Sequence, residues 1–119
     1  MIRDVVLSVE KHFVDNWNGD VNYDQTGYTP ANATWIELRV IPILSYNASL
    51  EDCTSEEFEL HLMAYGTNKV EAGELIETVI LFLQNKDIDG LKVRGWRQIA
   101  NGTLDTGTYF YKLIFDAKK

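Results

Sequence analysis

The spacing of apolar residues predicts a helix at the start of the chain. Five of them recur three or four positions apart, which places them on one side of a helix: Ile2, Val5, Val6, Val9 and Phe13. Charged residues occupy the opposite side, and Asn18-Gly19 is expected to end the helix. Residues 18–33 are rich in Gly, Asn, Asp and Thr, and this composition predicts a loop.

Two alternating segments in the middle of the chain predict an antiparallel hairpin. Apolar and charged residues alternate in residues 34–44, and residues 58–64 alternate in the same way. Pro42 lacks the N–H that a ladder hydrogen bond needs, so it marks a strand edge, a bulge or the end of the strand. The acidic stretch between the two strands, residues 45–57, is expected to form a long hairpin loop.

Residues 68–85 have the pattern of a second helix. Asn68 lies three residues before Glu71, which is the spacing of a helix cap followed by an acid in the first turn. The expected buried stripe is Ala72, Leu75, Ile76, Val79, Ile80 and Leu83. Two further apolar residues widen it, so that the helix is expected to be covered on more than one side: Leu81 and Phe82. Gly73 costs about 1 kcal/mol relative to alanine inside a helix, which suggests a close backbone contact there.

The end of the chain predicts a second hairpin. Residues 91–100 and 108–117 both alternate, and Asp89-Gly90 forms the turn that leads into them. The expected order is therefore helix, strand, strand, helix, strand, strand. This order corresponds to an α+β fold in which about four antiparallel strands form a sheet with two helices packed on it. We expect a single domain that covers residues 1–119.

One short motif in the last hairpin raises the question of catalysis. Leu104 to Thr108 read Leu-Asp-Thr-Gly-Thr, and Asp-Thr-Gly is the signature of the catalytic aspartates of pepsin-like and retroviral proteases. Such an enzyme needs two aspartates that share one proton. It also needs substrate walls and a flap, whereas the residues after Gly107 correspond to one strand only. Asp and Gly are also common turn residues, so we interpret Asp105 as part of a turn.

Composition narrows the possible functions. The chain has 119 residues and a formal net charge of −7, so duplex nucleic acid is a poor default partner. The longest apolar runs fall short of the roughly 18 residues that a membrane span needs, and the N-terminus does not resemble an export signal. The one cysteine, Cys53, cannot form an internal disulfide, which fits a reducing compartment.

The residues that carry chemistry do not cluster in the sequence. No group of His, Cys and acidic residues has metal-ligand spacing, and no glycine loop for phosphate is present. His12 and His61 are expected to have structural or surface roles. Acidic neighbours raise the pKa of a thiol, so Cys53 is expected to be a poor nucleophile. We therefore expect a protein without catalytic residues, metal or cofactor.

A basic cluster and several aromatic residues are candidates for contact with a partner. In residues 91–97, a period of two places Lys92, Arg94 and Trp96 on one strand face, and Arg97 follows. This cluster fits contact with an acidic partner, or with the acidic 51–57 segment of another copy; the alternative is an ordinary solvated sheet face. Trp35 and Tyr46 are further candidates, because large aromatic residues often anchor interfaces.

The whole arrangement resembles a known family. Four stretches carry the resemblance: MIRDVVLSVEKHF, WIELRVIPILSYNASL, FELHLMAYGTNKVEAGELIETVILFLQN and RGWRQIANGTLDTGTYFYKLIFDAK. Together they are similar to the small tail-terminator (tail-completion) proteins of tailed bacteriophages and prophages. The likeness covers nearly the full chain, and it rests on element order, length and diffuse patterns, since this family has no sharp motif.

The resemblance implies a structural role without enzymatic activity. Proteins of this family cap the growing tail tube, end its polymerisation and present a surface to the head-completion or connector protein. They act as a homohexameric ring whose central channel lets DNA pass without specific binding. The implied locations are the host cytoplasm during assembly and the tail–neck region of the virion, without membrane or cofactor.

A ring of identical copies needs a head-to-tail contact between two different patches. The basic 92–97 strand and the acidic 51–57 segment are the candidate pair, and the loop 45–57 is a candidate to order on the tail tube. The predicted interface residues are Tyr46, Leu50, Glu51, Asp52, Glu56, Glu57, Lys92, Arg94, Trp96 and Arg97.

Two other classes of function stay open. Another phage neck component, such as a head-completion protein, shares small size and ring symmetry but binds heads rather than tails. A small ligand-binding or enzymatic α+β domain would need a pocket with converging polar groups, and the sequence offers no clear set.

Overall fold

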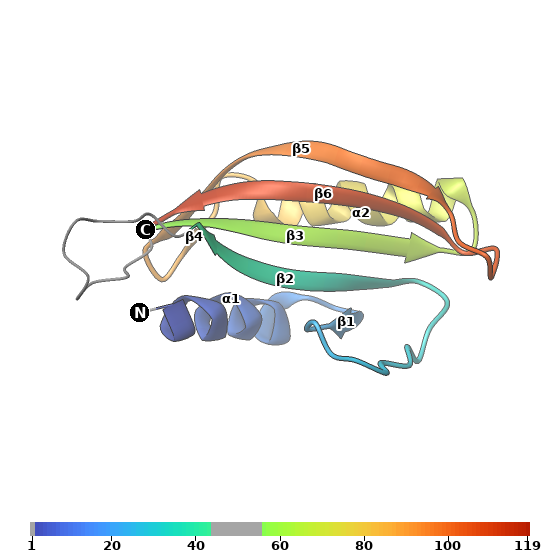
Figure 1. Cartoon of the computed structure of the whole chain (residues 1–119), viewed down its shortest axis with the longest axis horizontal. Coiled ribbons are helices and arrows are strands. Elements are labelled where there is room, and N and C mark those ends of the chain that lie inside the picture. The colour runs from blue at the N-terminus through green and yellow to red at the C-terminus, as the bar shows by residue number, and fades with distance from the viewer. Residues whose placement is uncertain (1, 44–55) are drawn as a thin grey trace.

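The computed structural model describes residues 2–43 and 56–119 (Figure 1). These residues form two helices and six strands. In chain order the elements are α1 (Ile2–Asn16), β1 (Asp20–Asn22), β2 (Trp35–Ile43), β3 (Glu57–Gly66), α2 (Lys69–Leu83), β4 (Asp87–Ile88), β5 (Leu91–Thr103) and β6 (Tyr109–Lys118).

The strands form one curled, mixed sheet in the order β1-β2-β3-β6-β5-β4 (Figure 1). β1 runs parallel to β2, and every other neighbouring pair is antiparallel. The α+β class with two helices therefore agrees with the structure, but the prediction of an antiparallel four-stranded sheet in the order α-β-β-α-β-β is wrong. β1 and β4 were missed because strands of three and two residues are too short to show alternation.

Hydrogen bonds of side chains hold β1 at the edge of the sheet. The Asp20 carboxylate accepts from the backbone N–H of Asn32 at 2.7 Å and from its side-chain amide at 3.1 Å. The Asn22 side chain accepts from the Gln25 N–H at 2.8 Å. The polar residues that predicted a loop in 18–33 thus fold that loop back so that β1 lies beside β2.

Both helices pack on the same face of the sheet. α1 buries Val5, Val9 and Phe13, as its periodicity predicts. From the strands, the core takes the residues that share this face in the register: Ile36, Leu38, Phe58, Leu60, Leu62, Ala64, Leu91, Val93, Leu113, Phe115 and Ala117. The two helices meet at Phe82 of α2 and Phe13 of α1, whose ring centres lie 4.8 Å apart. Leu81 is 77% exposed, so the prediction that α2 is covered at this residue is wrong.

The start of α2 agrees with the sequence pattern. The Asn68 side chain accepts from the Glu71 N–H at 2.9 Å and caps the helix. The close backbone contact lies at Gly66, just before the cap, because a Cβ there would come within 2.6 Å of the Ala72 nitrogen. Gly73, at which the sequence predicted such a contact, has only the Tyr111 ring within 3.7 Å of a built Cβ.

β5 and β6 form the last hairpin, and Asp105 lies in its exposed turn. The Leu104 N–H donates to the Thr108 carbonyl at 2.8 Å, and the Gly107 N–H donates to the Leu104 carbonyl at 2.9 Å. Gly107 has a φ of 87°, which favours glycine. The Asp-Thr-Gly motif therefore forms a hairpin turn. β5 carries two irregularities, between Val93 and Trp96 and between Gln98 and Ala100.

Candidate interaction surface

The face of the sheet opposite the helices is the main candidate surface, and we call it the open face. The register places two rows of side chains on it, because neighbouring strands pair residue by residue. One row consists of Arg39, His61, Ile114 and Arg97, and the next consists of Ile41, Glu59 and Asp116. Both helices pack on the other side, so these side chains are not covered by any helix of the described chain.

An ionic network crosses the open face from β5 to β3. The Arg97 guanidinium donates to Asp116 on β6 at 3.1 Å and reaches over β6 to Glu59 on β3, also at 3.1 Å. The His61 ring nitrogen Nε2 lies 3.0 Å from the other oxygen of Glu59. Ile114, between these residues in the register, is only 7% exposed. We call Glu59, His61, Arg97 and Asp116 the ionic strap.

The strap favours the charged forms of Glu59 and Arg97. The hydrogen bond to His61, and after it the one to Arg97, lowers the pKa of the Glu59 carboxyl. The hydrogen bonds to Asp116 and Glu59 raise the pKa of Arg97. Both groups therefore remain ionised at neutral pH, and the strap joins three adjacent strands without a net excess of cations.

An aromatic row covers the other end of the open face. Trp35 on β2 stacks on Tyr65 on β3 with ring centres 3.9 Å apart, and Phe110 on β6 lies 6.5 Å from Tyr65. The ring centres of Tyr28 and Trp35 lie 5.7 Å apart. The Tyr65 hydroxyl donates to the Met63 sulfur at 3.3 Å, and burial raises the pKa of Tyr65 to about 12. These rings form a small apolar cluster outside the main core.

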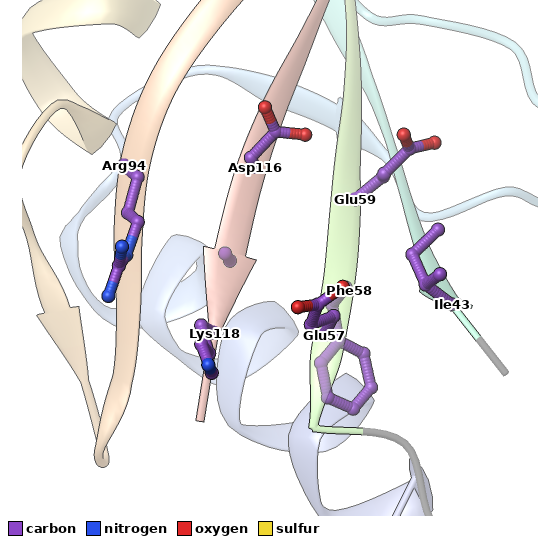
Figure 2. Close-up of a pocket in the computed structure, with 8 residues that line it drawn as sticks. Ile43, Glu57, Phe58, Glu59, Arg94, Asp116 and Lys118 are labelled. Atoms are coloured by element: carbon purple, nitrogen blue, oxygen red, sulfur yellow. The ribbon is translucent and has the colours of Figure 1, made fainter. Parts of the chain in front are cut away.

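A hollow of about 430 Å³ opens beside the ionic strap, at the end of the sheet where β2 stops. Figure 2 shows Glu57 and Glu59 on β3, Asp116 and Lys118 on β6, and Arg94 on β5 around it. Because these five residues are charged, we call this space the charged hollow. Ile43, Phe58 and Ala117 complete its lining. Its walls carry both signs of charge, so it does not select one simple ion.

The structure separates Trp96 from the basic residues of the predicted cluster. The irregularity between Val93 and Trp96 adds a residue to β5, so the period of two does not continue through this stretch. Trp96 pairs with Phe115 of the core side and is 42% exposed, whereas Arg94 lines the charged hollow. Arg97 belongs to the ionic strap. The prediction that Lys92, Arg94 and Trp96 share one face is therefore wrong.

The described part of the acidic segment lies next to the basic residues of the same chain. Glu57 pairs with Lys118 in the register, and Lys118 pairs with Lys92. Glu56 is exposed, and its carbonyl accepts from the Lys119 N–H at 2.8 Å. The other predicted interface residues lie outside the described residues: Tyr46, Leu50, Glu51 and Asp52. Glu56 and Glu57, the described residues of the acidic segment, thus lie at the same end of the subunit as Lys92 and Lys118.

The ionic strap and the aromatic row were not predicted from the sequence. The alternation of residues 58–64 places Glu59 and His61 on one face of a strand, but it does not show their partners. Their partners follow from the pairing of β3 with β6 and of β6 with β5, and the sequence pattern does not give this strand order or register. The signal that was available is the alternation itself, because Glu59 and Asp116 each occupy the outward position of their strand.

Within residues 2–43 and 56–119, no group of three or more His, Cys, Asp or Glu side chains could hold a metal ion. No helix of the described chain is long and apolar enough to cross a membrane. The sequence matches no protein-family model and no curated protein sequence.

Proposed function

We propose that this chain is a structural protein of tailed-phage assembly. In this proposal it caps the tail tube, ends tube polymerisation and forms the head–tail joining surface as a homo-oligomeric ring. The resemblance of nearly the whole sequence to the tail-terminator family suggests this role. A role of this kind needs broad contact surfaces on a stable support rather than a catalytic pocket.

The observation that carries the proposal is the open face. A sheet covered by helices on one side only leaves the other side available for contact with other proteins. Aromatic residues and arginine are enriched in protein interfaces, and this face presents Trp35, Arg39 and Arg97 together. The ionic strap keeps the strands in register under this surface, which suits a protein that must present a fixed shape.

The charged hollow and its neighbours form the proposed contact with the tail tube. A ring needs two different patches on each subunit for its own joints. Because Glu56, Arg94 and Lys118 lie at one end of the sheet, we assign them to one shared contact rather than to the two sides of a joint. Arg94→Glu or Glu56→Lys should then block tail joining while ring formation persists.

Addition of the protein to polymerising tail tubes tests the function directly. We expect tube growth to stop and the protein to be found at one tube end in electron micrographs. Glu77→Lys, which reverses a charge on the exposed side of α2, is the matched control and should stop growth like the wild type. Tubes that keep growing at saturating wild-type protein would contradict the proposal.

A neck component that binds heads is the second candidate, and the same preparation separates the two. Co-sedimentation with DNA-filled heads in the absence of tails would favour a head-completion role. Co-sedimentation with tube ends alone favours the tail-terminator role that we propose.

A further inference from the structure

The outer edge of β5 is open over most of its length. β4 pairs only with Leu91 and Lys92, and the Val93 N–H donates to the Lys86 carbonyl at 2.8 Å. From residue 94 to residue 103, no strand of the described chain lies beside β5 on the side away from β6. The backbone N–H and C=O groups on that side are therefore open to pairing with another strand.

This edge is basic although the protein is acidic. Residues 91–103 contain three cationic residues and no acidic residue, whereas the whole chain has a formal net charge of −7. Arg97 is neutralised within the chain by Glu59 and Asp116. Arg94 is exposed and takes part in no ion pair with a described residue. Within the described residues, this guanidinium is left to pair with an acidic side chain of a partner strand.

The two sides of the edge differ in chemistry. Arg94 lines the charged hollow together with Glu59 and Asp116 of the open face. Trp96 pairs with Phe115, so it lies on the helix side, where 42% of its surface is exposed. Between them, a Cβ on Gly95 would meet no atom within 4 Å, so the backbone is accessible there. Glycine inside a strand often marks a place where another backbone comes close.

A second copy of the same edge is a poor partner. Pairing of β5 with β5 of another copy would place two cationic edges side by side and bring Arg94 of each copy near the other, and like charges across strands are destabilising. Bulges and cationic residues are devices by which proteins prevent edge strands from pairing with themselves. β5 has both bulges and cationic residues. An acidic partner strand would neutralise the cationic residues and so remove their repulsion.

We propose that residues 94–103 of β5 bind an extended acidic segment of a partner protein, which adds to the sheet as a further strand. Side chains of a strand alternate between its two faces. The partner segment therefore alternates acidic residues, which meet Arg94, with apolar residues, which meet Trp96. This inference deepens the proposed function by naming how an assembly partner is recognised, and it rests on that function only for the origin of the partner.

A synthetic peptide of alternating glutamate and valine, roughly ten residues long to match the edge, is the probe. The controls are a lysine–valine peptide of the same pattern and a glutamate–valine peptide of the same composition without alternation. Binding is measured by titration calorimetry, and its location by hydrogen exchange of the full chain. Arg94→Glu tests the cation, and Lys69→Glu, at the exposed start of α2, makes the same charge change elsewhere.

We expect the alternating acidic peptide to bind and to slow amide exchange in residues 94–103. Arg94→Glu should weaken binding at least about tenfold, because like charges at a contact are strongly unfavourable, and Lys69→Glu should leave it unchanged. The inference is overturned by absence of protection at the solubility limit of the peptide, or by equal binding of the lysine–valine peptide. Unchanged binding by Arg94→Glu, or protection of 94–103 by self-association alone, would overturn it too.

The two assays distinguish failure of the strand-binding inference from failure of the proposed function. Protein that ends tube growth but ignores the acidic peptide would retain its proposed role and lose this edge. Protein that binds the peptide at 94–103 but leaves tube growth unaffected would retain the edge and lose the role.

Discussion

At the scale of single residues, Gly66 shows how closely β3 and α2 approach. A Cβ at Gly66 would lie 2.6 Å from the Ala72 backbone nitrogen, a distance that real Cβ atoms do not reach. We expect Gly66→Ala to lower the free energy of unfolding by about 1–3 kcal/mol, because the backbone must move to make room. Urea denaturation measures this change.

Gly73→Ala is the matched control within the next element. Its new methyl group meets only the Tyr111 ring, at 3.7 Å, which is an ordinary contact. The substitution should stabilise α2 by up to about 1 kcal/mol through helix propensity. Similar destabilisation by both substitutions would show that the close approach at Gly66 is not the cause.

Tyr65 gives a residue-scale prediction at alkaline pH. Its pKa is about 12 in the folded protein, against an ordinary value of 10.0, because the ring is buried. Since the folded-state pKa is raised, its contribution is present below pH 10 and is lost as pH rises through 12. The unfolded chain ionises first, so the loss by pH 12 is about 2 kcal/mol.

Denaturation series at several alkaline pH values compare the wild type with Tyr65→Phe. The variant should lose less stability than the wild type between pH 10 and 12. Parallel curves for the two proteins in this range would mean that Tyr65 is not the group responsible.

At the scale of elements, the Asn68 cap marks the start of α2 and has a measurable effect on stability. The Asn68 side chain holds the Glu71 N–H, which would otherwise lack a partner in the first turn. Asn68→Ala should lower the free energy of unfolding by about 1 kcal/mol. Asn68→Asp keeps an accepting oxygen and should restore most of the loss, and an equal loss in both variants would contradict the capping role.

The ionic strap joins three strands, and we expect its contribution to the free energy of unfolding to fall at acidic pH. The hydrogen bond to His61 lowers the pKa of Glu59 below its ordinary value of 4.5. Its contribution is therefore present above pH 4.5 and is lost as pH falls through the folded-state pKa. Glu59→Gln should flatten the stability curve below pH 4.5, whereas Glu77→Gln on the exposed side of α2 should not. If the wild type and Glu59→Gln lose the same stability below pH 4.5, the strap does not cause the acid dependence.

The sequence predicts the long elements well because each shows its own period. α1 and α2 follow the three-and-four spacing, and β2 and β3 follow alternation, so their bounds agree within a few residues. β1 depends on hydrogen bonds between Asp20 and Asn32, which no periodicity reveals. The irregularities in β5 likewise escaped detection, and they moved Trp96 to the opposite side from the predicted one.

At the scale of the whole molecule, one sheet presents three different surfaces. The helix side holds the core, and the open face holds the ionic strap and the aromatic row. The edge of β5 from residue 94 to residue 103 pairs with no other strand of the described chain on the side away from β6. The sequence predicted the charged candidates but not their grouping, because the register of β3, β6 and β5 brings together residues that are far apart in the chain. These distinct surfaces fit the role in assembly that we propose.

The native mass of the wild-type protein across a concentration series, with electron micrographs of the largest species, tests the central claim most directly. The proposed role predicts closed rings of about six copies, because head-to-tail contacts that close give rings of identical subunits. A monomer at every concentration, or a closed dimer that does not grow further, would contradict a self-assembling tail cap.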